Sequence, residues 1–540
     1  MSGAGAAVDV AVIGAGVNGA GIARDAAMRG LSVAVFDQQD LCSGTSAWSS
    51  RLVHGGLRYL EYAEIPLVFE SLHERRYLLD IARHLVRPLP IAIPVFDGAR
   101  RGRWLVRAGM LAYDLLSIGK ALPRHRMLDA DEMLAEYPGM QSQGLRGGAR
   151  YFDAQVTYAE RLVLENLLAA RAAGADVRLW HEVTSIEVDE GTVQAIRFRD
   201  AAGNDGRLQA RVVVNAAGPW VDNVLRRTGE RAPRLIGGTK GSHVVVSRFP
   251  GAPETAFYVE AGSDGRPIFI LPWNGLFLIG TTDIRCEGDP GDVRASRDEI
   301  GYLLAETNRV FPQAGLSETD VHYAYAGVRP LPYRAAGPES AITRRHIIRR
   351  DKDIAGNLLS IIGGKLTTYR HLAEQVVDRA GKCLRRRLPA CRTHDTPLPG
   401  AHGTEDAQRE LAALGALSDD GVRRLAGLYG GRGRRLARLA REDASLGAPL
   451  DSARTVLCAE VALACHEEFA TTLTDIVFRR LMIGLAADQG RPLYGAVAAA
   501  ASRELNWSDE TRVDELRRLE AFADSLRVPP GDTDQSAPAR

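Results

Sequence analysis

The sequence has few cysteines and no paired cysteine motif. Its six cysteines, Cys42, Cys286, Cys383, Cys391, Cys458 and Cys465, are scattered over 540 residues. This spacing argues against a disulfide framework and against a zinc site, and it suggests a reducing compartment. We therefore expect no bound metal.

Long apolar runs and an excess of one charge are also missing. No window of 18 or more apolar residues is free of charge, so we expect no membrane-spanning helix. The 68 basic and 67 acidic residues give a net charge of +1, which offers no global field for nucleic acid. The first eight residues carry no basic region, so we expect neither a secretory signal nor a transit peptide and predict a cytoplasmic protein.

A glycine-rich turn is present near the start of the chain. Residues 9–13 form a β-branched apolar run, GAGVNG follows at 14–19, and residues 20–29 have a helical pattern. Such glycines allow a tight turn and close approach to a pyrophosphate at the helix N-terminus. A second strand at 31–36 ends at Asp37, the spacing expected for a ribose contact. The pattern predicts a dinucleotide-binding βαβ unit without separating NAD from FAD.

The pattern changes twice further along the chain. Residues 236–284 are rich in β-branched and aromatic residues broken by Gly, Pro and Asn, which predicts an antiparallel sheet. Residues 405–523, including 459–485, have helical spacing. We predict an α/β protein with a Rossmann-like nucleotide-binding domain, an antiparallel-sheet substrate domain and an all-helical C-terminal domain.

Polar side chains that core or surface packing does not readily explain gather in four short segments. They are Cys42–Ser46 continuing through Ser49 to Tyr59, Lys240–His243, Ala326–Leu331 with Arg344, and Gly363–Arg370. Arginines there offer the planar fork that can hold two oxygens of an anion such as phosphate, although a single arginine is more often a solvated surface residue.

These motifs resemble those of the FAD-dependent glycerol-3-phosphate dehydrogenases, the aerobic, respiratory enzymes of the D-amino-acid-oxidase-like flavoprotein group. The matching stretches are IGAGVNGAGIARDAAMRG at 13–30, SSRLVHGGLRYLE at 49–61 and GGKLTTYR at 363–370. The resemblance covers roughly residues 10–370 and extends less specifically into the helical region. It implies FAD as the cofactor and oxidation of sn-glycerol 3-phosphate to dihydroxyacetone phosphate.

The resemblance also assigns residues and domains. It implies FAD contacts from Gly14, Gly16, Asn18, Gly19, Asp37, Thr45, Ser46, Ser49, Gly218, Gly364, Leu366 and Thr367, and substrate contacts from Arg58, Tyr59, Arg329, Arg344 and Lys365. We expect the FAD-binding domain at 1–95, 150–235 and 340–395, the substrate domain at 96–149 and 236–339, the helical domain at 396–526 and a disordered tail at 527–540.

Oxidation of an alcohol by a flavin needs a base for the hydroxyl proton. Histidine titrates in the useful range, so we nominate His243 as the base, with Arg329 and Lys365 stabilising the developing alkoxide. The alternative for His243 is a hydrogen-bonded core or substrate-positioning residue, and we interpret His54 as structural.

Residues 100–118 form a basic amphipathic stretch. Trp104, Ala108, Leu111, Leu115 and Ile118 share one helical face, and Arg100, Arg101, Arg103 and Arg107 flank it. Such a helix can lie in a bilayer interface, and the alternative is a helix packed on its own protein. Because the respiratory members pass electrons to quinone at a membrane, we predict a bacterial peripheral protein on the inner face of the cell membrane.

Several alternatives remain open from the sequence. Oxygen could replace quinone as the electron acceptor, and a homodimer is one oligomeric state the sequence allows. A related flavin amine oxidase would need only one arginine for a substrate carboxylate, fewer than the basic residues here. A non-catalytic flavoprotein that uses its helical domain as an interaction module is the remaining hypothesis.

Overall fold

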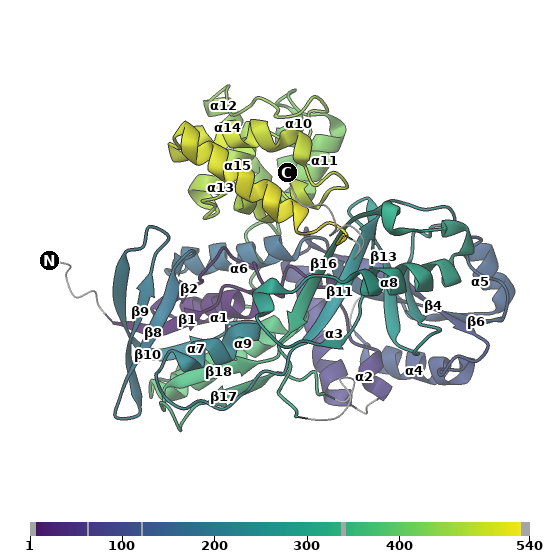
Figure 1. The fold of residues 1–540 in the computed structure, drawn as a ribbon, viewed down its shortest axis with the longest axis horizontal. Coiled ribbons are helices and arrows are strands. Elements are labelled where there is room, and N and C mark those ends of the chain that lie inside the picture. The colour runs from purple at the N-terminus through teal and green to yellow at the C-terminus, as the bar shows by residue number, and fades with distance from the viewer. Residues whose placement is uncertain (1–6, 62–63, 120–121, 336–341, 531–540) are drawn as a thin grey trace, which may run out of the picture.

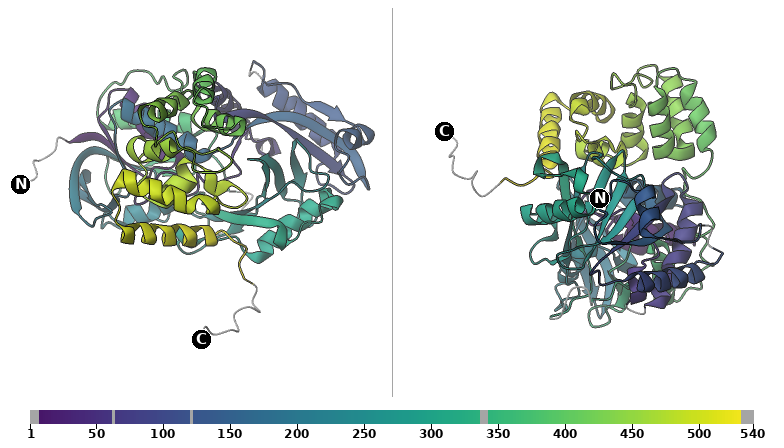
Figure 2. Two further views of the ribbon diagram at one scale, coloured as in Figure 1. Left: turned by 90° about the horizontal axis from the view of Figure 1, so that it is seen from above. Right: turned by 90° about the vertical axis from the view of Figure 1, so that its right-hand side faces the viewer.

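The computed structural model describes residues 7–61, 64–119, 122–335 and 342–530, with the backbone alone of Arg58 and Glu61. Figures 1 and 2 show two sheet layers side by side and a cap of C-terminal helices stacked on one side of them. Within the described part of the chain, no helix is both long and apolar enough to cross a bilayer. Residues 531–540 of the predicted disordered tail lie outside the described residues.

The first sheet forms around the predicted βαβ unit. Its strands run in the order β17 (Ile347–Arg350), β18 (Leu358–Ile362), β10 (Asp205–Asn215), β1 (Val8–Ile13), β2 (Val33–Phe36) and β7 (Asp176–Arg178), with β8 (Glu182–Asp189) and β9 (Thr192–Arg199) extending from β10. The pairs β18–β10, β10–β1, β1–β2 and β2–β7 are parallel, as a Rossmann-like sheet requires.

Both faces of this sheet are covered, which explains the continuous apolar character of β1. Val10 and Val12 pack in a core with α1 (Val17–Met28), α6 (Ala159–Ala172) and α9 (Tyr369–Cys383). Ala11 and Ile13 face the opposite core, made by β8, β9 and α7 (Val221–Arg226). Strands buried on both faces lose the polar alternation of a half-exposed strand.

The second sheet is the substrate-side layer. Its strands run β15 (Ile284–Arg285), β11 (Thr239–Val246), β14 (Leu276–Gly280), β13 (Pro267–Trp273), β12 (Ala256–Glu260), β4 (Val86–Phe96), β6 (Leu145–Val156) and β3 (Leu52–Val53), with β16 (Val321–Arg329) beside β11 and β5 (Arg126–Leu128) beside β6. Helices α8 (Arg297–Val310) and α5 (Ala130–Glu136) pack in the core on one face.

This sheet differs from the prediction in two respects. The pair β12–β4 is parallel, so the sheet is not purely antiparallel. It also draws in β3, nearly all of β4 and the part of β6 from residue 150 onward, which fall in the ranges 1–95 and 150–235 that we assigned to the FAD-binding domain. The hydrogen bonds between β4 and β6 join segments about 60 residues apart, and short-range sequence patterns carry no record of such a pairing. The domain ranges otherwise remain predictions.

Three further helices come from residues 58–116, on either side of β4 in the chain. They are α2 (Arg58–Glu61), α3 (Ile65–Ile81) and α4 (Arg103–Leu116), and α3 packs on α4. In Figure 1, α4 lies on the side of the molecule away from the C-terminal helices.

The C-terminal region is helical, as its periodicity predicts. It contains α10 (Thr404–Ala412), α11 (Asp419–Tyr429), α12 (Gly433–Glu442), α13 (Cys458–Glu467), α14 (Tyr494–Leu505) and α15 (Asp509–Asp524). The segment 459–485 is not one helix, because α13 ends at Glu467 and a π-helical turn, Asp475–Arg480, follows. Apolar residues of this region share one core with the second sheet.

Candidate active site

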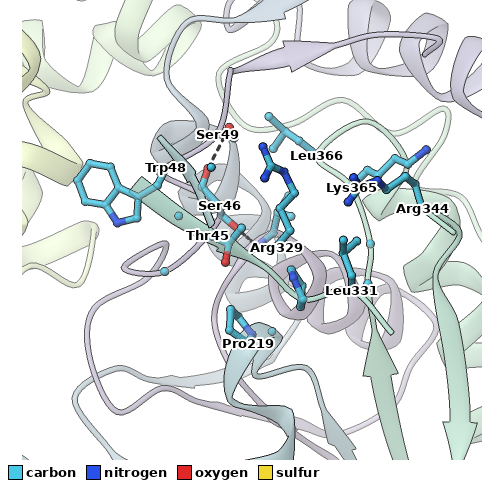
Figure 3. Close-up of a pocket in the computed structure, with 18 of the residues that line it drawn as sticks. Thr45, Ser46, Trp48, Ser49, Pro219, Arg329, Leu331, Arg344, Lys365 and Leu366 are labelled. Carbon is cyan, nitrogen blue, oxygen red and sulfur yellow. Dashed lines mark hydrogen bonds between the residues drawn. The ribbon is translucent and has the colours of Figure 1, made fainter. Parts of the chain in front are cut away.

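A cavity of about 960 Å³ is lined by residues of both sheets. The glycine turn after β1, the loop after β2 and the segment 43–54 border it, as do strands β11 and β16 and the loop at 363–367. Figure 3 shows Thr45, Ser46 and Ser49 around the same space as Arg329, Arg344 and Lys365. The structure thus brings together most of the side chains nominated from four distant parts of the sequence.

The glycine turn has the backbone geometry that its sequence predicts. Gly14 has φ +107°, and a Cβ there would lie 2.6 Å from the Ala216 carbonyl oxygen. The positive φ and the contact with Ala216 therefore both exclude a side chain at position 14. Gly16 is the N-cap of α1 without a side-chain cap, which leaves backbone N–H groups at the helix N-terminus beside the cavity.

Gly19 has a packing role in the structure, and its predicted FAD contact stays a prediction. A Cβ there would lie 1.8 Å from the Gly14 carbonyl oxygen, and Gly19 is not among the residues that line the cavity. It allows α1 to pack closely on the turn, so its contribution is to shape the site from behind.

Asp37 closes the end of β2 and lines the cavity. Its carboxylate accepts hydrogen bonds from the Ala15 amide at 2.7 Å and the Gln39 amide at 3.0 Å. Burial nevertheless raises the pKa of the Asp37 carboxyl to about 6, because desolvation outweighs these two bonds.

The segment 45–49 is fixed by bonds to other elements. Thr45 Oγ1 donates to the Val328 carbonyl at 2.6 Å, and Ser46 Oγ accepts from the Val17 amide at 3.1 Å. A third bond runs from Asn18 Nδ2 to the Gly363 carbonyl at 3.2 Å. Together these bonds connect the glycine turn, the serine-rich segment and the loop at 363–367 along the cavity.

A cationic cluster lies where β14 and β16 end. Arg329 Nη1 and Arg344 Nη2 each lie 3.1 Å from a different oxygen of the Asp283 carboxylate. Burial opposes ionisation of Asp283, but the two guanidinium groups prevail and lower its pKa. Asp283 therefore orients both arginines, and the sequence analysis missed it. Its signal was weak: a Thr-Thr-Asp run directly after a buried strand.

Lys365 approaches the same cavity from the loop at 363–367. Its Nζ lies 3.7 Å above the Tyr59 ring, close enough for a cation–π contact. Both Lys365 Nζ and Arg344 Nη1 are buried, and neither has a hydrogen-bond partner among the described residues. Two desolvated donors of positive charge at one cavity indicate a site for an anion.

His243 lies on β11 and is almost fully buried. Its Nε2 pairs with Ser50 Oγ at 2.8 Å, and its ring stacks on Tyr325 at a centroid distance of 5.0 Å. Burial, with smaller contributions from Arg329 and Arg51, lowers the pKa of His243 to about 3. The imidazole is therefore neutral at physiological pH.

His54 also borders the cavity, which our structural interpretation of it did not anticipate. Its backbone amide donates to Thr367 Oγ1 at 3.1 Å, and burial lowers the pKa of its ring. Arg58 begins α2, but its side chain lies outside the described residues, so its predicted substrate contact stays a prediction. Among the described residues, no group of three or more His, Cys, Asp or Glu side chains could hold a metal ion.

Comparison with known proteins decides the family. Residues 9–370 match the FAD dependent oxidoreductase family, and residues 391–512 match the C-terminal domain of alpha-glycerophosphate oxidase. A glycerol-3-phosphate dehydrogenase from Synechocystis is 43% identical over 97% of both chains. The chain belongs to the FAD-dependent glycerol-3-phosphate dehydrogenase family.

Other members and one solved structure agree with this family. A glycerol-3-phosphate dehydrogenase from Pseudomonas aeruginosa is 38% identical, with 88% of this chain and 92% of that protein covered. A D-erythritol 1-phosphate dehydrogenase from Brucella abortus is also 38% identical, with 87% and 93% covered. The glycerol-3-phosphate dehydrogenase of Bacillus halodurans, solved with FAD, superposes with a TM-score of 0.80 at 29% identity over 98% of this chain and 97% of that one.

The cavity of this FAD-dependent dehydrogenase fits its cofactor. The N-terminus of α1, where the N-cap residue Gly16 has no side chain to cap it, suits a diphosphate, and Gly14 leaves the backbone open to it. The Asn18 Oδ1 atom is buried beside the cavity without a partner among the described residues. Gly218 has φ +58° and open space where a Cβ would be, so an aromatic ring system could approach that backbone.

Proposed function

We propose that this protein oxidises sn-glycerol 3-phosphate at C2 to dihydroxyacetone phosphate. The observation that carries the proposal is a pair of buried donors, Arg344 Nη1 and Lys365 Nζ, at the cavity of an FAD-dependent dehydrogenase. Neither has a hydrogen-bond partner among the described residues. Arg329 and Arg344 share the carboxylate of Asp283, and Lys365 adds a third positive charge at the cavity, which Glu64 also lines. The surplus suits a phosphate dianion, whereas an amino acid carboxylate would need only one arginine.

FAD supplies a ring that accepts the hydride from C2. We assign its ADP half to Gly14, Gly16, Asn18 and Asp37. Its flavin half would lie along a second set of residues, namely Thr45, Ser46, Ser49, Gly218, Gly364, Leu366 and Thr367. All eleven of these residues line the cavity.

The hydroxyl proton requires an acceptor within hydrogen-bond reach. We retain His243 as the candidate base because its ring lines the cavity and is held by Ser50. Arg329 and Lys365 would stabilise the alkoxide as the proton leaves. A base with a pKa of about 3 is weak, and His54 is therefore a second candidate. It lines the same cavity, and its backbone is held by the hydrogen bond from its amide to Thr367 Oγ1.

We further propose that the enzyme binds peripherally to the inner face of the cell membrane and passes its electrons to quinone. Trp104, Leu111, Leu115 and Ile118 are 80%, 56%, 68% and 66% exposed, so the apolar face predicted for this helix is turned away from the protein core. Ile65 and Phe69 on the neighbouring α3 are half exposed as well. Isolated exposed apolar residues are common, but four on one face of the stretch 104–118, with two more beside them on α3, favour an interface with lipid.

The basic residues of this region have different roles. Arg103 and Arg107 on α4 are exposed, and Arg107 lies over the Trp104 ring at 5.8 Å. Arg101 instead pairs with Glu260 at 2.7 Å. Arg103 and Arg107 are therefore the residues we assign to anionic headgroups.

Anaerobic addition of sn-glycerol 3-phosphate to the purified protein tests the reaction. We expect the oxidised-flavin absorbance at about 370 and 450 nm to bleach rapidly, because the substrate reduces the cofactor. Bleaching by glycine, sarcosine or D-amino acids instead would support the amine oxidase hypothesis. A flavin that no polyol phosphate or amine reduces would support the non-catalytic one. Reoxidation of the bleached enzyme by a soluble quinone or by oxygen then identifies the acceptor.

Binding to vesicles that contain anionic lipid tests the membrane proposal. The double variant Leu111→Glu, Leu115→Glu should lose sedimentation with vesicles and keep its activity with a soluble acceptor. Val513 on α15 is 52% exposed, so Val513→Glu is a matched control that should still bind. Equal vesicle binding by both variants would exclude α4 as the attachment site.

A further inference from the structure

The helical C-terminal domain contacts the loop that follows β2. This loop, residues 37–44, begins at Asp37 and borders the cavity with Asp37, Gln38, Gln39, Ser43 and Gly44. Its central residue, Asp40, is fully buried and is not among the residues that line the cavity. Asp40 faces the C-terminal domain instead.

Two consecutive arginines of the π-helical turn bind the Asp40 carboxylate. Arg480 forms a bidentate pair with it, Nη1 to Oδ2 and Nη2 to Oδ1, both at 2.8 Å. Arg479 Nε adds a third bond to Oδ2 at 2.6 Å. Burial opposes ionisation of Asp40, but the two guanidinium groups outweigh it and hold the pKa of Asp40 below its usual value. Three charge-assisted bonds therefore hold this one carboxylate of the loop.

The same turn also supports the residues behind the loop. Asp475 accepts from the Trp180 indole at 3.2 Å and from Arg479 Nη2 at 2.7 Å. The amides of Trp180 and His181 in turn donate to the carbonyls of Gln39 at 3.0 Å and Asp37 at 2.7 Å. The C-terminal domain therefore reaches the loop by two routes, one through Asp40 and one through the 180–181 backbone.

We propose that Arg479 and Arg480 are positioning residues for FAD: by holding Asp40 they fix the loop 37–44 against the ADP half of the cofactor. The C-terminal domain would then contribute to cofactor retention without touching the cavity. This inference rests on the proposed placement of the ADP half at Gly14, Gly16 and Asp37. Loss of the anchor lets the loop adopt several conformations, and FAD binding must then restrict them again.

The chain supplies a matched control. Glu468 is a second fully buried carboxylate of the domain interface, and it also pairs with two arginines. Arg161 binds it through Nη1 at 2.7 Å and Nη2 at 3.0 Å, and Arg432 binds it at 2.6 Å. Arg161 lies on α6 and not on the loop. Arg480 Nε donates to the backbone carbonyl of Glu468 at 2.6 Å, a bond that the Gln variant keeps. Glu468→Gln therefore removes a comparable interface anchor while leaving loop 37–44 held.

The experiment compares FAD affinity among variants that remain folded. Apoprotein of the wild type, Asp40→Asn, Arg479→Lys and Glu468→Gln is titrated with FAD by flavin fluorescence, and circular dichroism confirms the fold at the titration temperature. We expect Kd for FAD to rise about tenfold or more in Asp40→Asn and several-fold in Arg479→Lys, which keeps the charge but loses the fork. Glu468→Gln should stay within about twofold of the wild type, whatever its effect on Tm.

A second readout separates positioning from general damage. With saturating FAD, kcat of Asp40→Asn and Arg479→Lys should return to the wild-type value, because neither residue meets the substrate. Equal Kd changes in Asp40→Asn and Glu468→Gln would overturn the proposal. Wild-type protein that binds FAD but leaves sn-glycerol 3-phosphate unoxidised would contradict the proposed function and leave this comparison intact.

Discussion

The proposed anion site depends on two nitrogens that have no hydrogen-bond partner among the described residues. Arg344 Nη1 and Lys365 Nζ are buried at the cavity, and Asp283 binds Arg344 through its other terminal nitrogen, Nη2. A buried donor without a partner costs free energy unless a ligand supplies the acceptor. These two side chains are therefore the first to mutate.

We expect Lys365→Met and Arg344→Met each to lower kcat/KM for sn-glycerol 3-phosphate by about 10- to 100-fold, because a hydrogen bond to a charged group contributes about 1.5–3 kcal/mol. Steady-state kinetics with a soluble acceptor measures this. Arg226→Met, an exposed arginine on α7, is the control. If both variants keep wild-type kcat/KM, the phosphate binds elsewhere.

The pH profile distinguishes the roles of the two histidines. The pKa of His243 is lowered to about 3, so its imidazole stays neutral from about pH 5 to 8, and His243→Asn should reduce the rate without moving any acid limb in that window. Because the folded-state pKa lies below the ordinary value of 6.5, His243 also makes the free energy of unfolding fall as pH drops from about 6.5 towards 3.

The measurement is kcat/KM against pH for the wild type, His243→Asn and His54→Asn. An acid limb that vanishes only in His54→Asn would identify His54 as the titrating group. A limb near pH 6 that vanishes in His243→Asn would contradict the neutral state assigned to His243.

At the scale of elements, the turn between β1 and α1 is the feature that sequence and structure share most closely. Its glycines are set by backbone contacts: Gly14 faces the Ala216 carbonyl, and Gly30, at the other end of α1, also has positive φ but open space around it. A substitution at Gly30 therefore tests the cost of the positive φ alone, whereas one at Gly14 adds a steric conflict with the Ala216 carbonyl.

Gly14→Ala should abolish FAD retention, because the new Cβ would lie 2.6 Å from a backbone oxygen in a conformation that side chains rarely adopt. Gly30→Ala carries only the conformational cost, about 1–2 kcal/mol, and should still be purified with FAD. The flavin-to-protein absorbance ratio after gel filtration measures both. Equal flavin content would show that the turn tolerates a side chain.

For the whole molecule, the interface between the helical domain and the sheets depends on buried charge. Glu468, Asp40 and Glu165 are buried there, as are Arg161, Arg479 and Arg480, and Arg161 lies over the Tyr429 ring at 4.4 Å. Burial opposes ionisation of Glu468, yet Arg161 and Arg432 lower its pKa to about 2. Buried pairs of this kind destabilise a fold when one partner is lost.

We expect acid to weaken this interface. Because the folded-state pKa of Glu468 lies below the ordinary 4.5, its stabilisation is present above about pH 4.5 and is lost as pH falls towards 2, by about 3 kcal/mol at most. Urea unfolding at several pH values should show this dependence, and Glu468→Gln should flatten it. An unchanged pH dependence in Glu468→Gln would assign the effect to other carboxyl groups.

The sequence by itself determined the features that depend on neighbours in the chain. The βαβ unit with its glycine turn, the helical C-terminal region and the family motifs at 13–30, 49–61 and 363–370 are local patterns, and periodicity and glycine spacing encode them directly. The apolar face of residues 104–118 was also readable, although only the fold showed that it is exposed.

Only the tertiary structure decided the features that depend on distant contacts. It places β3 and β4 in the second sheet, and it brings His54 to the cavity. It also pairs Asp283 with Arg329 and Arg344, and Asp40 with Arg479 and Arg480, and all of these contacts join segments far apart in the chain. Their formation depends on which surfaces become buried together, and burial sets both the pairing of charges and the pKa values that follow from it.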